Sequence, residues 1–342
     1  MSALASLAWN NKFGLPALPP AGTFKDQSIL ITGASSGLGL AAAVHFVNLG
    51  ASKVIITART KSRGDAARQA IESQTGIKNV VELMELDMST FEHTKSFADQ
   101  VKAEVGSIDY VLLNAGLLNT KFKQTSDGWE ETIQVNVLST ALLAILLLPW
   151  IKEAGKGHAH LGFVTSGLHR FVDIDRNFPT KDVLSYYSKK ENYPKAPPRD
   201  PMYGISKLLE HYVVNEIAKI ALGSDGSPQV IVNTICPGLV KSDLARQYKT
   251  SYLLTAGVNL FQAVLSKSTE GGARTLVLSG LTPASDHGKF IKHYSTDEEY
   301  NRQVEKNITG PKGQELQAKV WNEVLAILEG SIPEVKGIVA RS

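Results

Sequence analysis

Short apolar runs alternate with longer segments of helical periodicity along most of this chain. The apolar runs are bounded by turn residues and have the lengths typical of buried β-strands. We expect strands at 29–31, 53–59, 80–86, 110–113, 161–165, 230–235 and 288–294. Between them, apolar residues recur at the spacing of one helix face. We expect helices at 40–49, 62–74, 91–105, 203–221 and 314–328, and one or two more within 128–148.

This alternation predicts an α/β fold. Strands that are joined through right-handed helical crossovers lie parallel, so the chain should form a Rossmann-like doubly wound parallel sheet with helices on both faces. Ligands of such sheets bind at the carboxyl ends of the strands. The chain shows no internal repeat, linker or second glycine-rich core. We therefore expect a single catalytic domain over residues 25–342, preceded by an N-terminal arm, 1–24, that is rich in proline.

Two segments depart from the alternation. Residues 170–201 are polar and rich in Pro and Tyr, and they are inserted between a strand and a helix, where connections are usually a few residues long. Residues 241–267 follow another strand end and contain an apolar stretch, 252–265. We interpret the insertion and this second segment, a lid, as elements on the substrate side of the site.

The first strand leads into a glycine-rich turn of the form Thr-Gly-x3-Gly-x-Gly. Gly33 permits a sharp turn, Gly37 lets the backbone approach a ligand, and Gly39 leaves room for the next helix to pack on the sheet. The N-terminus of that helix then points free N–H groups at an anion, and a dinucleotide pyrophosphate is the expected anion. Ordinary turns also collect glycine, so this motif alone is weak evidence.

Composition narrows the class of protein. The 342 residues are 43% hydrophobic and 20% charged, which is ample for a packed core. The net charge of +3 comes from scattered Lys and Arg without interleaved aromatics, so we expect no nucleic-acid partner. A single cysteine, Cys236, excludes an intramolecular disulfide, and the N-terminus lacks the pattern of a secretory signal. We therefore expect a cytoplasmic protein.

The longest apolar stretch, 138–151, contains Ser139, Thr140 and Pro149. It is shorter than the roughly 20 residues that a bilayer requires. We expect no transmembrane segment here, and we interpret the stretch as a buried or subunit-interface helix.

Histidine and cysteine could carry chemistry, but here they lack the pattern for it. His158, His160 and His169 have no further ligands at regular spacing, so we expect surface or substrate-side residues and no metal site. Cys236 precedes Pro237 without a neighbouring His, and we interpret it as a small buried residue rather than a nucleophile.

A tyrosine and a lysine share one face of a predicted helix. Tyr203 and Lys207 are four residues apart, and an ammonium beside a phenol favours the phenolate, which brings its pKa of about 10 toward neutrality. Tyr186 and Lys190 have the same spacing. Prolines follow that second pair and prevent a long helix, whereas Tyr203 begins an uninterrupted helical pattern. We therefore expect Tyr203 to be the functional tyrosine.

The end of the second strand indicates which dinucleotide is bound. An NAD-preferring protein of this fold places a carboxylate there, which would repel the 2′-phosphate of NADP. Here the strand ends in Thr57-Ala58-Arg59, and Arg59 can pair with a phosphate, helped by Lys61 or Arg63. The alternative is that Arg59 is a solvated cation at a strand end. We predict NADP(H) as the cofactor.

Several motifs occur together in a fixed order. They are the glycine-rich turn, Asp87, Asn114-Ala115-Gly116, Asn136, Ser166, Tyr203 with Lys207, and Pro237-Gly238. In these motifs, from about residue 25 to residue 294, the chain resembles the short-chain dehydrogenase/reductases. Its long insertion and its closing helix are most similar to the retinol-dehydrogenase-like and fungal branches of that family.

The resemblance implies a set of site residues. The catalytic residues would be Asn136, Ser166, Tyr203 and Lys207, with Tyr203 as general acid/base and Ser166 bonded to the substrate oxygen. Lys207 would also hold the nicotinamide ribose, and Asn136 would tie Lys207 to a water chain. Ser242 stands where the family often has Thr, and Asp87 would contact adenine. The implied cofactor-binding residues are Gly33, Ser35, Ser36, Gly37, Leu38, Gly39, Arg59, Asp87, Met88, Asn114, Ala115, Gly116, Tyr203, Lys207, Pro237, Gly238, Val240 and Ser242.

The resemblance also implies an activity. We expect NADPH-dependent reduction of a ketone or aldehyde, in secondary metabolism, with a small-molecule carbonyl or alcohol as the partner. Oxidation of a lipophilic alcohol such as a steroid or retinoid is an alternative, and so is a non-catalytic NADP-binding module. The sequence leaves open whether the chain assembles as a homodimer or as a homotetramer.

Overall fold

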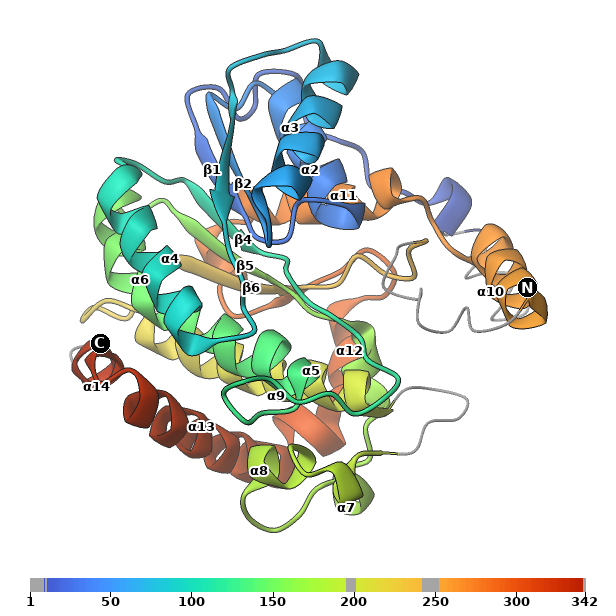
Figure 1. Ribbon diagram of the computed structural model, residues 1–342, viewed down its shortest axis with the longest axis vertical. Helices are drawn as coiled ribbons and strands as arrows, with labels where there is room; N and C mark the ends of the chain where they lie inside the picture. The colour runs from blue at the N-terminus through green and yellow to red at the C-terminus, as the bar shows by residue number, and fades with distance from the viewer. Residues whose placement is uncertain (1–8, 10, 195–200, 242–251, 341–342) are drawn as a thin grey trace.

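A parallel sheet forms the centre of the protein. The computed structural model describes residues 9, 11–194, 201–241 and 252–340, which fold around a seven-stranded sheet in the order β3-β2-β1-β4-β5-β6-β7 (Figure 1). Every neighbouring pair of these strands is parallel. The strands are β1 (Ser28–Ile31), β2 (Lys53–Ala58), β3 (Val81–Glu85), β4 (Tyr110–Leu113), β5 (His160–Val164), β6 (Ile231–Ile235) and β7 (Phe290–Ile291). The prediction of a doubly wound α/β fold is confirmed.

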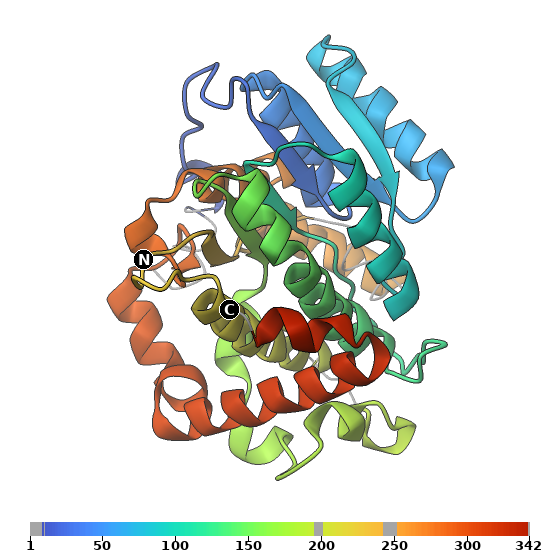
Figure 2. The same ribbon diagram turned by 90° about the vertical axis from the view of Figure 1, so that its left-hand side faces the viewer.

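Helices cover both faces of the sheet, as the two views show (Figures 1 and 2). On β1, Ile29 and Ile31 face one apolar cluster, and Leu30 faces the other. Because both faces are buried, the central strands are apolar without alternation. The first cluster includes α2 (Gly37–Asn48), α3 (Lys61–Thr75) and α11 (Thr269–Leu278), and the second includes α4 (Phe91–Glu104), α6 (Thr140–Ala154) and α9 (Pro201–Ile220).

The predicted helical region 128–148 is built from three successive pieces. It consists of α5 (Glu131–Ile133), a π-helical turn η1 (Gln134–Ser139), and α6, which continues beyond the predicted end to Ala154. Together, Glu131–Ala154 are long and apolar enough to cross a membrane by length and composition, but 94% of their most apolar window is buried within the protein. These helices therefore form part of the core.

Some elements differ from the predictions, and two of them show why. The last strand, expected at 288–294, is only β7, because it pairs with Thr234 and Ile235 alone before the chain turns away. Helix α11 was not predicted, since adjacent glycines interrupt its apolar pattern. A Cβ on Gly272 would lie 2.5 Å from Val240 and 2.9 Å from Leu38, so glycine is what allows this close packing.

The insertion 170–201 and the chain's end pack together. The described insertion contains the last part of η2 (Gly167–Phe171), α7 (Ile174–Asn177), α8 (Val183–Tyr187) and η3 (Lys190–Asn192), and it is followed by α9. The chain ends in α12 (Asp297–Val304), the π-helical turn η7 (Glu305–Thr309), α13 (Pro311–Ser331) and α14 (Glu334–Val339). Glu323 accepts hydrogen bonds from the backbone N–H groups of Leu184 and Ser185, at 2.9 and 3.2 Å, which fastens α8 to α13.

The described part of the arm lies against the lid segment. Asn11 Nδ2 donates to the carbonyl of Leu265 at 2.7 Å, and Lys12 Nζ donates to the carbonyl of Ser266 at 2.8 Å. Leu265 is the last residue of α10 (Tyr252–Leu265), and Ser266 follows it. Short 3-10 turns, η5 (Ser279–Leu281) and η6 (Ala284–Asp286), then lead from α11 to β7.

Two histidines lie in a buried aromatic cluster between η2, α9 and α12. The ring centroids of His169 and His211 are 4.8 Å apart, and His169 Nε2 lies 2.9 Å from the hydroxyl of Tyr300. Burial lowers the pKa of His211 to about 4 and lowers the pKa of His169 well below its ordinary value. Of the two positions expected for His169, on the surface or on the substrate side, the surface position is wrong because the residue is fully buried.

Replacing Gly39 by Ala should destabilise the fold. A Cβ there would lie 2.6 Å from Asn114 Nδ2 and 2.8 Å from the Gly33 carbonyl, so α2 would have to move off the sheet. We expect a loss of about 1–3 kcal/mol in the free energy of unfolding, measured in urea. Gly330→Ala, in α13, meets no atom within 4 Å and should instead gain about 0.5–1 kcal/mol. Equal effects of the two substitutions would contradict this account of Gly39.

Replacing His211 by Phe should flatten the acid dependence of stability. A histidine whose pKa falls from 6.5 to about 4 on folding binds more protons in the unfolded chain between these values, so stability is lost as the pH falls through this window. Between neutral pH and pH 5 the variant should lose roughly 1–2 kcal/mol less than the wild type. His158→Gln, which changes an exposed residue, is the control and should leave the acid dependence unaltered. Identical curves for wild type and His211→Phe would refute the prediction.

Candidate functional site

The glycine-rich turn between β1 and α2 is held by the two strands beside β1. From β2, the carbonyl of Thr57 accepts from Ala34 N and its hydroxyl accepts from Gly33 N, both at 3.0 Å. Gly33 has a φ of +66°, and a Cβ there would lie 2.8 Å from the Cα of Ala115. The turn therefore needs glycine at this position both for its backbone conformation and for the close approach of the segment after β4.

The segment Asn114-Ala115-Gly116, which follows β4, forms the other wall of the turn. The hydroxyl of Thr32 accepts from the backbone N–H groups of Asn114 and Ala115, at 2.9 and 3.0 Å. Asn114 Nδ2 donates in return to the carbonyls of Thr32 and Gly33, at 2.9 and 3.2 Å. Two motifs that are about eighty residues apart in the sequence are thereby joined, as their positions at neighbouring strand ends predict.

The N-terminus of α2 fits an anionic group such as a pyrophosphate. The side chain of Ser36 makes no capping hydrogen bond, and the first turn of α2 has no acidic residue. Gly37 has a φ of +60°, and no atom lies within 4 Å of the place where its Cβ would be. The N–H groups of this helix end therefore have neither a capping acceptor on Ser36 nor an acidic side chain in the first turn, which suits an anion. Ser35 and Leu38 are half-buried beside them.

Three predicted cofactor contacts lie further along the same edge of the sheet. Arg59 is exposed directly after the end of β2. Asp87 and Met88 follow β3, where Asp87 Oδ1 accepts from Ser89 N at 3.0 Å and Met88 is buried. The carboxyl ends of β2 and β3 therefore extend the surface that begins at the glycine-rich turn.

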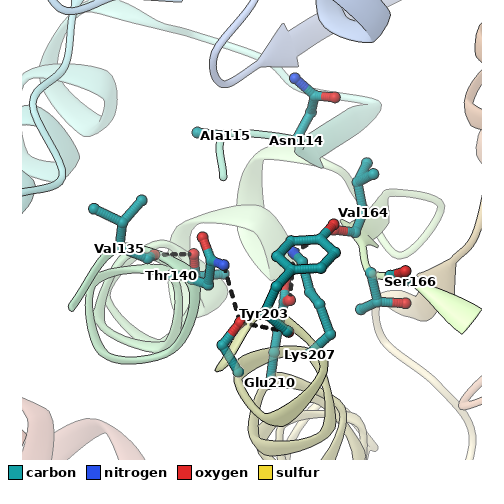
Figure 3. A network of polar contacts seen from close by, with 12 residues as sticks. Asn114, Ala115, Val135, Thr140, Val164, Ser166, Tyr203, Lys207 and Glu210 are labelled. Carbon is teal, nitrogen blue, oxygen red and sulfur yellow. Dashed lines mark hydrogen bonds and ion pairs between the residues drawn. The ribbon is translucent and has the colours of Figure 1, made fainter. Parts of the chain in front are cut away.

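Tyr203 and Lys207 lie on the buried face of α9, with 8% and 3% of their surfaces exposed. Lys207 Nζ is 5.9 Å from the centroid of the Tyr203 ring and donates to the carbonyl of Val164 at 2.9 Å. Val164 ends β5, two residues before Ser166, whose side chain is half-buried. The helix that carries the tyrosine and lysine is therefore fixed to the strand end that carries the serine (Figure 3).

The alternative pair does not share a helix. Tyr186 lies in α8, whereas Lys190 begins η3, and both residues are exposed. This separation agrees with the expectation that the prolines after Lys190 prevent a continuous helix.

Asn136 lies in the π-helical turn η1 and is fully buried. Its Oδ1 accepts from Leu117 N at 2.9 Å, while its Nδ2 donates to Leu117 O at 2.9 Å and to Ser206 Oγ at 3.1 Å. A Cβ on Gly116 would lie 3.3 Å from Asn136 Oδ1 and 3.6 Å from Lys207 Nζ. The Asn136 side chain thus fastens the segment after Gly116 to α9.

The loop after β6 completes the described edge. Pro237 is buried, Gly238 has a φ of +82°, and Val240 forms a parallel bridge with Lys267. A Cβ on Gly238 would lie 3.2 Å from Lys267 Nζ. Cys236 is buried, as expected, and its Sγ accepts from Gly167 N at 3.2 Å. Ser242 lies outside the described residues.

Sequence reasoning missed Glu210, the carboxylate that pairs with Lys207 at 2.6 Å. The signal was present, because Glu210 follows Lys207 by three residues and interrupts the apolar face of the predicted helix. It also missed Thr32 and Thr57, whose hydroxyls hold the glycine-rich turn. Among the described residues, no group of three or more His, Cys, Asp or Glu could hold a metal ion.

The chain is similar to known proteins over its whole length. Residues 27–166 match the family model of short chain dehydrogenases. The chain is 34% identical to "Short-chain dehydrogenase/reductase ffsI" of Aspergillus flavipes, over 100% of this chain and 96% of that protein. It is 35% identical to "Short-chain dehydrogenase/reductase phmF" of Phaeosphaeria nodorum, over 95% of this chain and 93% of that protein.

A solved structure shares the fold. L-sorbose reductase of Gluconobacter frateurii, in complex with NADPH and L-sorbose, matches with a TM-score of 0.59 and 18% identity, over 80% of this chain and 96% of that chain. The full-length similarity to the two fungal proteins carries the family assignment, and the sheet order agrees with it. The chain therefore belongs to the short-chain dehydrogenase/reductase family, on its fungal branch, and is an oxidoreductase that acts on CH–OH or carbonyl groups.

Proposed function

We propose that the protein is an NADPH-dependent reductase of a ketone or aldehyde, with Tyr203 as the general acid. The observation that carries this proposal is the placement of Tyr203 and Lys207 on one buried helix face, bonded through Lys207 to the end of β5 beside Ser166. The alternative is a non-catalytic NADP-binding module. Such a module would not need a buried ammonium beside Tyr203, and burying a charge costs free energy, so the buried Lys207 favours catalysis.

Each residue has a distinct part in the proposed reaction. When bound, the nicotinamide supplies the hydride that reduces the carbonyl carbon. The Tyr203 hydroxyl gives its proton to the carbonyl oxygen, and the Lys207 ammonium stabilises the phenolate that remains. The Ser166 hydroxyl donates a hydrogen bond to the same oxygen. In the reverse direction the Tyr203 phenolate accepts the proton of an alcohol.

NADP(H) is the proposed cofactor. Beyond the end of β2, exposed Arg59 offers a guanidinium where NAD-binding proteins of this fold have a carboxylate. Lys61 is already paired with Asp65 at 2.9 Å, so Arg59 and Arg63 are the cations that we assign to the 2′-phosphate. The NADPH in the structure of L-sorbose reductase lends support by analogy.

The insertion 170–201 and the lid 241–267 would form the substrate side. In the described parts, η2 follows Ser166 directly. Arg170, which belongs to η2, lies against Tyr294, with its guanidinium carbon 5.2 Å from the centroid of the Tyr294 ring. Oxidation of a lipophilic alcohol remains the second candidate, since the same groups serve both directions. We also propose that the enzyme is cytoplasmic and serves secondary metabolism, and the names of the fungal relatives do not identify its substrate.

Tyr203→Phe should abolish turnover while NADPH affinity stays nearly unchanged, because only the transferable proton is removed. General acid catalysis contributes about 10²–10⁴-fold, so kcat should fall at least about a hundredfold. NADPH consumption in a screen of ketones and aldehydes provides a substrate for this measurement, and NADPH fluorescence reports binding. Tyr186→Phe is the matched control and should keep the wild-type kcat. A Tyr203→Phe enzyme with most of its kcat would rule out the assignment.

Arg59→Ala should weaken NADPH binding about ten- to a hundredfold, as expected for the loss of a charge-assisted hydrogen bond, and should barely change NADH binding. The dissociation constants can be compared by titration of the reduced cofactors. Arg68→Ala removes a cation from the same region, where it pairs with Asp65, and should leave both affinities intact. A wild-type protein that binds NADH as tightly as NADPH would contradict the proposal.

A further inference from the structure

A buried carboxylate lies directly beside the proposed catalytic lysine. Glu210 Oε2 is 2.6 Å from Lys207 Nζ, and the two side chains are 3% and 4% exposed (Figure 3). Both residues belong to α9, one helical turn apart. The pair is therefore an ion pair inside the protein rather than a surface contact.

Such a buried ion pair contributes little to the stability of the fold. Taking two charges out of water costs about as much as their attraction returns, and apolar residues of similar size often stabilise a protein better. Burial raises the pKa of Glu210 to about 7, against the charge and hydrogen bond of Lys207, which lower it. The residues on either side, Leu209 and His211, are also buried, so no water-exposed surface relieves the cost.

Other charged groups near α9 are engaged elsewhere in the described chain. Among the described residues, Lys207 supplies the charge that acts on the Glu210 carboxyl. The neutral groups facing Lys207 are the Val164 carbonyl and the Tyr203 ring. Titratable groups on the elements packed against α9 have other contacts: Glu131 with Lys123, Lys152 with the Ile220 carbonyl, Arg170 with the Gly167 carbonyl, His169 with Tyr300, and Glu323 with Leu184.

Within the described part of the chain, the hydrogen bonds of Lys207 leave one of its N–H donors for chemistry. An ammonium has three N–H groups, and two of them go to Val164 O and Glu210 Oε2. These acceptors fix the tetrahedral ammonium and hence the direction of its third N–H. The Asn136 side chain uses its own groups on Leu117 and Ser206, so the carboxylate of Glu210 is the anchor that Lys207 has on its own helix.

We propose that Glu210 is a positioning residue of the active site, which holds the Lys207 ammonium at the end of β5 and keeps it charged in a buried environment. This inference rests on the proposed roles of Tyr203 and Lys207. Without the carboxylate, the ammonium would have no counter-charge, and burial would favour the neutral amine. A neutral Lys207 no longer stabilises the Tyr203 phenolate, so catalytic activity would be lost at a lower alkaline pH than in the wild type.

Glu210→Gln tests this directly, because it keeps the size and a hydrogen-bond acceptor but removes the charge. The measurement is kcat against pH for alcohol oxidation by the full-length enzyme with NADP, using the alcohol product of a carbonyl found by the NADPH screen. We expect the alkaline limb of the profile to move to lower pH by about one unit or more, a tenfold loss on that limb. Glu210→Asp retains the charge and should restore the limb toward the wild-type position.

Glu216→Gln is the matched control, since Glu216 pairs with Lys219 on the same helix at the same spacing, 2.7 Å apart, but far along the helix from Tyr203. It should leave the pH profile unchanged. Circular dichroism confirms that each variant is folded. If Glu210→Gln does not fold, Glu210→Asp is compared with the wild type, and its shorter side chain should move the limb by a smaller amount. An alkaline limb at the wild-type pH in folded Glu210→Gln, or in Glu210→Asp where Glu210→Gln does not fold, would overturn the proposal. The Tyr203→Phe variant tells the two possible failures apart. If it loses turnover while the Glu210 variants keep the wild-type limb, the proposed function holds and only the role of Glu210 is refuted.

Discussion

The carboxyl ends of parallel strands all meet at one edge of the sheet, and the organisation of the site depends on this constraint. Segments far apart in the sequence, after β1, β4, β5 and β6, are neighbours there because the strand order places them side by side. Thr32 illustrates the effect. Its hydroxyl and carbonyl connect the glycine-rich turn to Asn114, so the proposed cradle for the cofactor is held by bonds between side chains and backbone groups that the sheet aligns. The polar groups at this edge would otherwise be buried without partners.

Much of this arrangement could be predicted from the sequence, because it depends on local patterns. Apolar runs identified the strands, the glycines identified the turn after β1, and the prolines around 194–201 separated Tyr186 from Tyr203. Elements whose existence depends on distant contacts were missed or misjudged. Helix α11 needs glycine where it touches Val240 and Leu38, and the short β7 is set by its pairing with β6.

The same reasoning explains what was missed in the site. In the sequence, Glu210 is indistinguishable from an exposed carboxylate on a helix, because the burial of its helix face is not visible there. His169 likewise looks like an ordinary polar residue, although its ring packs against Phe290 and Tyr300. The side chain of Asn136 is bonded to Leu117 and Ser206, two partners that its place in the sequence does not indicate, and its help to Lys207 through a water chain stays a prediction. Burial and hydrogen-bond partners are properties of the assembled core, and no window of sequence contains them.

The contact between Lys207 and residue 164 has a consequence for how this enzyme can diverge. The lysine binds the main-chain carbonyl of Val164, an atom that every amino acid presents in the same place. A substitution of the valine that the surrounding core accommodates therefore leaves this hydrogen bond in place. The insertion is attached differently, through side chains such as Asp173 and Lys306, 2.8 Å apart, which exchange readily at an exposed surface. The attachment of the insertion can thus change without disturbing the main-chain contact that holds Lys207.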